Sequence, residues 1–383
     1  MITINCTGCG ACAEICPVKC INMGENKLGH IIPVIKTEKC ISCGLCKKKC
    51  PQNKSVEGRA PKKCYVAWSQ DEGERLFSAS GGIGNAFARC TIKNGGIVFG
   101  CDYDKNLELY HFAVKDENEL HRIQSSKYSQ SKAWICFGEI KKLLKANNLV
   151  MFIGTPCQVA GLKRSLGEDY DNLLLIDLVC HGTPPTKYLK EHINHIYPEK
   201  VTKIRFRGEF DQKLTIWNNN KIVYQCDREQ DRYFSSFYQN MISRDSCFWC
   251  AYAKPERISD ITIGDFWGIG HLNKIEALSE RPSLVLINSQ KGERFFEKAK
   301  EQLVFEEREV TEGIKGNGRL NNPPGKTKEA IVFQKIYLVF RFDIAVSITN
   351  KLFDIQDKIA LICKVLKRKV KKTLKVEVKE WKK

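Results

Sequence analysis

The sequence lacks the marks of a membrane-spanning or secreted protein. It contains no run of about 18 apolar residues, so no transmembrane helix is expected. Cys6 follows Met1 so closely that a secretory signal with an apolar centre and a cleavage site is not expected either. We therefore expect a cytoplasmic protein. With 383 residues, 43% of them hydrophobic, the chain is long enough for two or three packed domains.

The sequence also lacks the paired histidines of a zinc finger, because its seven histidines do not fall in that spacing with cysteine. The net charge of +18 would suit a nucleic-acid-binding protein, but the charge is unevenly placed. Residues 326–383 carry sixteen Lys or Arg and six Asp or Glu, a net charge of +10. The rest of the chain is only mildly basic, and we expect no nucleic-acid partner.

Apolar residues recur at helical spacing within this basic segment, so 326–383 is expected to form a basic amphipathic helical tail. Three roles remain open for the tail. It could lie on the anionic inner face of the membrane, dock an acidic partner, or be a solvated helix.

Cysteine, by contrast, is abundant. Nineteen cysteines cannot all pair, and in a reducing compartment regularly spaced cysteines are more often ligands or catalytic groups than disulfides. The pattern Cys-x2-Cys-x2-Cys-x3-Cys-Pro occurs twice, from Cys6 to Pro17 and from Cys40 to Pro51. This is the spacing of bacterial ferredoxins, in which three thiolates of a run bind one 4Fe–4S cluster and the fourth binds the other cluster.

The predicted ligands of the two clusters therefore cross over between the runs. One set is Cys6, Cys9, Cys12 and Cys50, and the other is Cys40, Cys43, Cys46 and Cys16. Zinc fits poorly because it needs only four ligands. Cys20 lies outside the pattern and is expected to be a small buried side chain. Residues 1–58 are thus predicted to form an α+β, ferredoxin-like domain with two clusters.

Two further stretches, 59–145 and 146–325, are expected to form an α/β body with a mostly parallel or mixed sheet. The second stretch contains two strand–loop–helix units, with strands at Leu149–Ile153 and Leu173–Val179. Such units predict parallel strands, and ligands gather at the carboxyl ends of parallel strands. Cys157 and Cys180 lie in the loops that follow these two strands. A β-hairpin with a turn near Asn219 is predicted further along.

A second group of cysteines comprises Cys157, Cys180, Cys247 and Cys250. Four thiolates could bind a third 4Fe–4S cluster, or they could bind zinc, which has the same number of ligands. Cys157 could instead be a nucleophile at a helix N-terminus, where the helix dipole lowers the pKa of a thiol.

The small residues Ser80, Gly81 and Gly82 precede a predicted helix and would expose backbone N–H groups to an anion such as a phosphate. The stretch does not have the spacing of the dinucleotide-binding fingerprint. On its residues alone, a plain glycine-rich turn is the simpler interpretation.

Taken together, these stretches resemble the coenzyme F-420 hydrogenase/dehydrogenase beta-subunit family, in which an N-terminal two-cluster ferredoxin domain is common. The matching stretches lie between about residues 64 and 325, in the order of the family: Ser80–Gly82, Gly154–Leu162, Asp177–Gly182, Cys247–Cys250 and Ser259–Gly268.

The resemblance implies a flavoprotein that passes electrons between iron–sulfur clusters, including the third, and FAD. The acceptor would be a two-electron organic molecule, such as coenzyme F-420 or a bacterial substrate linked to surface polysaccharide. The flavin contacts implied are Ser80, Gly81, Gly82, Thr155, Gln158 and Asp265. Asp265 could instead cap the following turn.

His181 lies beside a proposed ligand and could shuttle a proton, because the ordinary pKa of histidine is near 6.5, or it could bond the loop backbone. The expected partner is an electron-donor protein or a small redox coenzyme. The alternative function is a pure electron-transfer subunit that feeds a separate catalytic chain.

Overall fold

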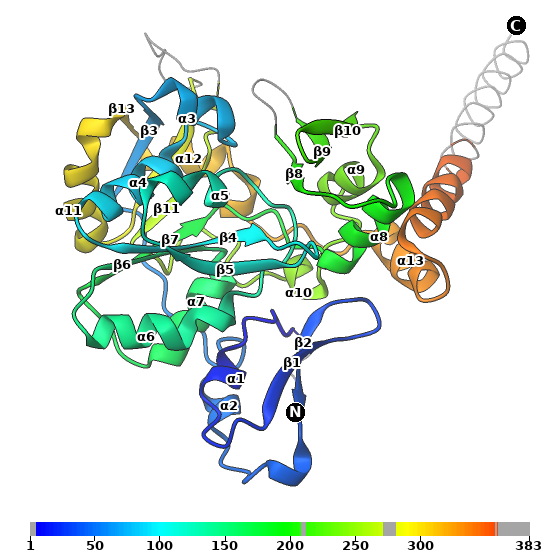
Figure 1. Cartoon of the computed structure of the whole chain (residues 1–383), viewed down its shortest axis with the longest axis horizontal. Helices are drawn as coiled ribbons and strands as arrows, with labels where there is room; N and C mark the ends of the chain where they lie inside the picture. The colour runs from blue at the N-terminus through cyan, green and yellow to red at the C-terminus, as the bar shows by residue number, and fades with distance from the viewer. Residues whose placement is uncertain (1–4, 208–211, 271–280, 357, 359–383) are drawn as a thin grey trace, which may run out of the picture.

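The computed structural model describes residues 5–207, 212–270, 281–356 and 358. The N-terminal ferredoxin-like region forms one end of the molecule (Figure 1). It contains α1 (Ala11–Glu14), the antiparallel strands β1 (Ile21–Glu25) and β2 (Ile31–Ile35), and α2 (Leu45–Lys48). Each of the two short helices directly follows a glycine with positive φ, Gly10 at 75° and Gly44 at 72°. The two ferredoxin-type runs therefore have the same local turn.

An eight-stranded mixed sheet forms the centre of the body. Its order is β13-β3-β12-β11-β7-β6-β4-β5. The four strands β4, β6, β7 and β11 are parallel to one another, and the strands that flank them pair antiparallel. The bounds are β3 (Lys63–Ser69), β4 (Ile97–Tyr103), β5 (Leu109–Val114), β6 (Val150–Gly154), β7 (Leu173–Leu178), β11 (Ile261–Asp265), β12 (Ser283–Ile287) and β13 (Leu303–Arg308).

Helices cover both faces of this sheet, which is why its central strands are almost continuously apolar. On β4, for example, Val98 packs into the layer that contains α4, whereas Phe99 packs into the layer that contains α6 and α7. The helices of the body are α3 (Glu72–Phe77), α4 (Ile83–Lys93), α5 (Leu120–Ile123), α6 (Phe137–Lys145), α7 (Pro156–Leu166), α11 (Gln290–Ala299) and α12 (Val310–Lys315).

The stretches 59–145 and 146–325 both contribute strands to this one sheet. Strand β3, from the first stretch, lies between β12 and β13 from the second. The expected mixed α/β architecture with a large mixed sheet is confirmed, and the sheet continues across residue 145.

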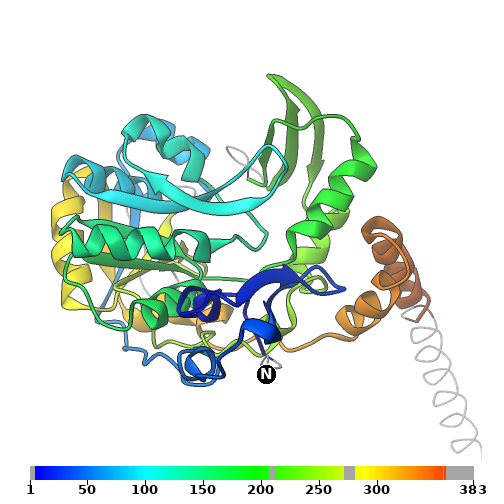
Figure 2. The same cartoon turned by 60° about the horizontal axis from the view of Figure 1, so that its bottom comes forward.

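A smaller lobe stands beside the sheet and carries the predicted hairpin (Figures 1 and 2). Its three-stranded sheet is β8 (Lys203–Arg205), β9 (Lys213–Asn218) and β10 (Lys221–Asp227), with Asn219 at a φ of 52° in the turn. Its helices are α8 (Thr186–Ile196), α9 (Arg232–Tyr238), α10 (Asp245–Phe248) and α13 (Lys328–Tyr337).

The first half of the predicted tail belongs to this lobe. Helix α13 and the helical residues 342–356 pack into the lobe core through buried side chains, among them Phe333, Phe342 and Val346. Residues 359–383 lie outside the described part of the chain. Within the residues that are described, no helix is both long enough and apolar enough to cross a membrane.

Candidate functional site

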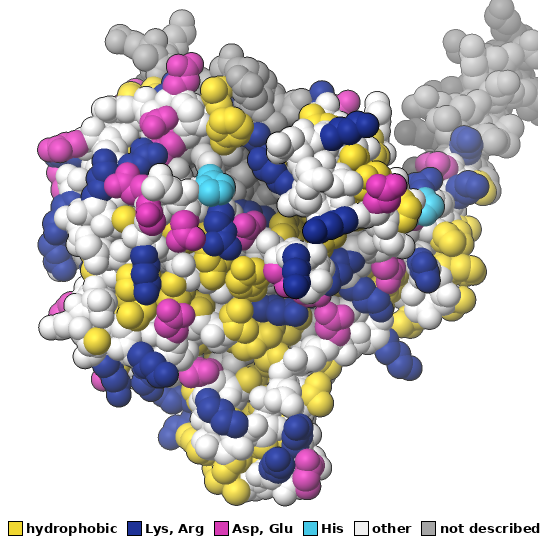
Figure 3. Space-filling model, viewed as in Figure 1, with side chains coloured by type: hydrophobic (Ala, Val, Ile, Leu, Met, Phe, Trp, Pro, Cys, Tyr) yellow, Lys and Arg dark blue, Asp and Glu magenta, His cyan; other side chains and the backbone are white. Residues whose placement is uncertain are grey.

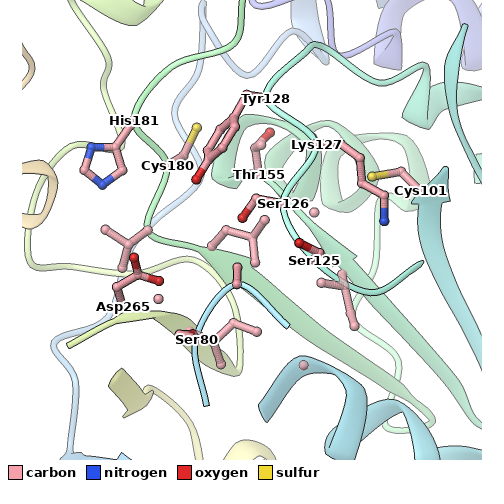
Figure 4. Close-up of a pocket in the computed structure, with 18 of the residues that line it drawn as sticks. Ser80, Cys101, Ser125, Ser126, Lys127, Tyr128, Thr155, Cys180, His181 and Asp265 are labelled. Atoms are coloured by element: carbon pink, nitrogen blue, oxygen red, sulfur yellow. The ribbon is translucent and has the colours of Figure 1, made fainter. Parts of the chain in front are cut away.

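A cavity of about 270 Å³ lies at the ends of the parallel strands β4, β6, β7 and β11, where the topology of the sheet predicts a ligand (Figure 4). The strands contribute Cys101, Ile153, Leu178 and Asp265 to its wall. The turn before α4, the loop at residues 123–131 and three residues of the lobe complete it; the lobe residues are Arg207, Phe237 and Tyr238.

Ser80 and Gly82 line the cavity, whereas Gly81 between them packs against Ala67 and Trp68 of β3. A Cβ on Gly81 would come within 2.6 Å of the carbonyl oxygen of Ala67, so this position excludes any side chain. Gly82 directly precedes α4 with a φ of 82° and provides no side-chain cap. The N-terminus of α4 therefore reaches the cavity uncapped, in the arrangement that binds anions in other proteins.

Buried Glu74 holds this turn in place. Its carboxylate accepts hydrogen bonds from Ser69 Oγ at 2.6 Å and from Asn85 Nδ2 at 2.5 Å, and it pairs with Arg89. Because Glu74 belongs to α3 and its partners belong to β3 and α4, these bonds join the three elements around the turn and hold it in place.

Lys127 and Cys101 lie at one end of the cavity (Figure 4). The Lys127 ammonium donates to the carbonyl oxygens of Arg122 at 2.9 Å and Gln124 at 2.6 Å, and burial lowers its pKa. The hydroxyl of Ser125 is buried without a hydrogen-bond partner among the described residues. A cation held by carbonyl groups beside an unused hydroxyl group suits an anionic ligand.

Asp265 and His181 lie at the other end (Figure 4). Asp265 Oδ2 accepts a hydrogen bond of 2.9 Å from Arg207, which ties the lobe to the end of β11. Burial, together with the nearby charge of Arg319, lowers the pKa of His181 to about 4. At neutral pH this imidazole is therefore uncharged, whereas the ordinary pKa near 6.5 was expected from the sequence.

Thr155 and Gln158 both line the cavity, but they also bond to each other. The backbone N–H of Thr155 donates to Gln158 Oε1 at 2.9 Å, and Gln158 Nε2 donates to Ser131 Oγ at 2.8 Å. With Pro156 as the first residue of α7, these bonds fix the helix start beside the cavity.

The cysteines at 157, 180, 247 and 250 come together beside the cavity. Burial, and next the proximity of Cys180, Cys247 and Cys250, raises the pKa of the Cys157 thiol. Thr155 Oγ1 lies 3.3 Å from Cys157 Sγ, and the N–H of Gly182 donates to Cys180 Sγ at 3.4 Å. All four cysteines are free, and Cys180 also lines the cavity.

The N-terminal cysteines lie in two groups that cross between the runs. Burial raises the pKa of the Cys12 thiol, and the nearby thiols of Cys9, Cys6 and Cys50 raise it further, to about 12. Cys50 therefore lies with the first run. Cys16 lies next to Cys20, and after burial both Cys16 and Cys40 contribute to raising the pKa of the Cys20 thiol, which places Cys16 near the second run.

Cys20 is buried, as expected, but it is not remote from the second group. Its sulfur lies 3.4 Å from Cys16 Sγ, and Cys40 contributes to raising the pKa of the Cys20 thiol, after burial and Cys16.

Tyr252 joins the first N-terminal group to the group at Cys157. It is 5% exposed, and its pKa is raised by burial and next by Cys157, Cys9, Cys250 and Cys50. Its hydroxyl group has no hydrogen-bond partner among the described residues. Arg257, paired with buried Asp177 at 3.0 Å, donates to the Tyr252 carbonyl and so holds this loop against β7.

Arg244 fixes the ferredoxin-like region to the body. Its guanidinium donates to the carbonyl oxygens of Cys6 and Ile31, each at 2.7 Å, and to Gln130 Oε1 at 2.9 Å. Gln130 in turn donates to the carbonyl of Thr7 at 2.8 Å. The first cysteine run therefore faces the body.

Four residues of the site, Lys127, Ser125, Arg207 and Tyr252, were not identified from the sequence. The run Ser125-Ser126-Lys127, small hydroxyl residues followed by a cation, was the available signal for the first two. Arg207 and Tyr252 have none, because their roles depend on contacts between distant segments.

The two ferredoxin-type runs and their position against an α/β body define an iron–sulfur electron-transfer protein of the oxidoreductase type. Residues 5–54 match the family model of the 4Fe-4S dicluster domain. Residues 147–313 match the family model for the C terminus of the beta subunit of coenzyme F420 hydrogenase/dehydrogenase. The chain is thus similar to the C-terminal domain of that beta-subunit family over residues 147–313 and to the dicluster domain over residues 5–54, and the resemblance stated from the sequence is confirmed over these residues.

Among solved structures, one match is a chain of the F420-reducing nickel–iron hydrogenase complex from Methanosarcina barkeri. It has 15% sequence identity and a TM-score of 0.44, and the match covers 69% of this chain and 92% of that one. No curated protein matches the sequence.

Proposed function

We propose that this protein is an iron–sulfur flavoprotein that carries electrons between an external donor and a two-electron organic acceptor. Eight cysteines of the N-terminal region would hold two 4Fe–4S clusters, the group at Cys157 a third, and the cavity FAD. The observation that carries the proposal is that the first cysteine group, the third cysteine group and the cavity are neighbours in the fold. Tyr252 lies close to both cysteine groups, and Cys180 belongs to the third group and also lines the cavity.

A cluster fits the third group better than zinc does. Zinc lies about 2.3 Å from each thiolate sulfur, which draws four sulfurs tightly around one ion. Across the described ranges, no three His, Cys, Asp or Glu side chains are gathered so as to hold a single metal ion. An iron cube instead binds its four thiolates at separate corners, so the four sulfurs need not converge on one point.

The cavity fits FAD through its polar groups. Lys127, the unused Ser125 hydroxyl and the uncapped N-terminus of α4 would hold the phosphates. The end with Cys180 and His181 would receive the redox-active ring system, beside the third cysteine group. When bound, a flavin exchanges single electrons with clusters and a hydride equivalent with an organic acceptor.

The residues of the chain orient and enclose such a ligand. Arg207 and Asp265 join the lobe to the sheet across the cavity, and Tyr128 Oη accepts a 2.8 Å hydrogen bond from Arg207. Uncharged His181 would exchange hydrogen bonds with the acceptor without adding a positive charge.

The test is anaerobic purification with quantitation of iron, sulfide, zinc and flavin, followed by reduction of candidate acceptors that include coenzyme F-420. We expect about twelve irons and one FAD per chain. Zinc without iron would overturn the proposal. Full iron with no flavin would leave the alternative, an electron-transfer subunit that feeds a separate catalytic chain.

A further inference from the structure

The two cysteine runs have the same spacing but different surroundings. In the first run, a Cβ on Gly10 would meet Trp134 at 2.2 Å, and one on Gly8 would meet the carbonyl oxygen of Ile31 at 2.6 Å. In the second run, nothing lies within 4 Å of the same position at Gly44. The body thus covers the first run and leaves the second open.

The residues of the two cysteine loops agree with this difference in surroundings. Ser42 takes the place of Gly8 and has a φ of 54°, a conformation that a residue with a side chain adopts only at some cost. The first run, which the body covers, has no room for a side chain at this position, whereas the second run, the outer one, accommodates one. Cys40 and Cys43 are exposed, whereas Cys9 is buried.

An apolar spot lies on the open run. Ile41 is 62% exposed and lies between the two exposed cysteines, and Leu45, the first residue of α2, is 37% exposed. Thr7 occupies the position of Ile41 in the covered run, and its carbonyl bonds to Gln130. A lone exposed isoleucine needs no explanation, but a pair of apolar side chains beside two exposed ligands forms a contact surface.

Positive charge surrounds this spot. Between residues 36 and 54 there is one acidic residue, Glu38, and there are six lysines: Lys36, Lys39, Lys47, Lys48, Lys49 and Lys54. All of these lysines except Lys49 are exposed. Lys and Arg side chains are spread over the ferredoxin-like region in the space-filling view (Figure 3).

We propose that this basic face docks an acidic one-electron carrier protein, with the apolar spot at the centre of the contact. The inference rests on the proposed function and names the partner of the cluster that the second run would bind. Each encounter oxidises the carrier by one electron and reduces the outer cluster by one electron, and no bond is made or broken. Opposite charges speed such encounters, and redox contacts of this kind are small and short-lived.

The test is anaerobic stopped-flow reduction of the purified full chain by a photoreduced acidic bacterial ferredoxin. We expect the second-order rate constant to fall by about tenfold or more as salt rises from low to high ionic strength. Lys36→Glu/Lys48→Glu should reduce the low-salt rate constant by a similar factor. The matched control, Lys115→Glu/Lys298→Glu, has the same change in net charge at exposed sites on the body and should change it less than about twofold.

Ile41→Thr introduces the residue that the covered run already tolerates at this position. It should raise the carrier concentration needed for half-maximal rate, while iron content and reduction by dithionite stay unchanged. A carrier rate unaffected by salt and by both outer-run variants, at full iron content, would overturn the docking proposal. Failure of the proposed function would show separately, as absent flavin or absent acceptor turnover in a chain whose clusters the carrier still reduces.

Discussion

The thiol of Cys157 has three candidate roles, and single substitutions separate them. As a cluster ligand, Cys157→Ser should remove about four irons, because a hard oxygen ligand replaces a soft thiolate poorly. Cys180→Ser and Cys250→Ser should give the same loss, and the N-terminal clusters should remain. Iron and sulfide analysis with electron paramagnetic resonance measures this. Cys226→Ser, in strand β10 of the lobe, is the control and should keep all its iron.

The two other roles predict different results. If the group binds zinc, each substitution lowers zinc and leaves iron unchanged. If Cys157 is a nucleophile, only Cys157→Ser stops turnover, and metal content stays the same in all variants.

Tyr252 presents an unpartnered hydroxyl group between two cysteine groups. We expect this group to donate a hydrogen bond to a cluster sulfur, and such bonds raise the reduction potential. Tyr252→Phe should therefore keep the full iron content and shift the potential of an adjacent cluster downward in a redox titration. Potentials equal to those of the wild type would show that the hydroxyl group does not reach a cluster.

The cysteine groups were predictable at this scale because their spacing is local and repeated. Tyr252 was not, because its importance arises from segments more than 200 residues apart in the chain that meet only in the fold. The environment of His181 was hidden for the same reason. Its pKa is shifted by burial and by Arg319, neither of which the local sequence reveals.

At the scale of elements, His192 joins α8 to α9 and to the helix at 342–356. It lies 2.9 Å from Asp231 Oδ2 and 2.8 Å from Asp343 Oδ1. Arg232 also faces Asp343, and Tyr224 donates to Asp231. Burial alone would lower the pKa of His192, but the two carboxylates outweigh it and raise the pKa to about 9.

A pKa raised above its unfolded value of about 6.5 stabilises the folded state below that pH, and this stability is lost as the pH rises through about 9. The free energy of unfolding should therefore fall by about 3 kcal/mol over this range. His192→Gln should flatten the pH profile of thermal unfolding, whereas His121→Gln, at an exposed site, should not. A wild-type profile that is flat between pH 6 and 10 would show that His192 does not gain stability from the carboxylates of Asp231 and Asp343.

Several elements follow from local sequence. The start of α7 at Thr155-Pro156 and the turn at Asn219 are determined by capping and turn chemistry. The position of β3 is not determined locally, because both its neighbours, β12 and β13, come more than 200 residues later. No periodicity within 63–69 predicts those partners.

At the scale of the whole molecule, the packing of α13 and residues 342–356 changes how the basic tail must be tested. Deleting the chain from Lys326 would remove part of the lobe core, whereas ending it at Lys358 removes only residues beyond the described helices. Residues 359–383 carry ten Lys or Arg and two Glu. We propose that this segment binds an anionic membrane surface.

The shortened chain should keep its iron and flavin and lose most of its binding to vesicles that contain phosphatidylserine. Each Lys or Arg near such a surface contributes about 1 kcal/mol, so the binding of the full chain should also weaken strongly with salt. Co-sedimentation with vesicles measures both effects, and neutral phosphatidylcholine vesicles are the control. Equal binding by the two chains would favour an acidic protein partner or no docking role.

The open surroundings of the second cysteine run also determine how sensitive the protein is to oxygen. Oxidation of cysteine follows exposure and thiolate character, so Cys40 and Cys43 are the ligands that dissolved oxygen reaches first. Aerobic damage should begin at the outer cluster and disconnect the carrier from the interior, while the covered cluster beside Trp134 and the cavity remain intact. Under the docking proposal, the exposure that would admit electrons therefore makes the second run the most oxygen-labile of the cysteine groups among the described residues.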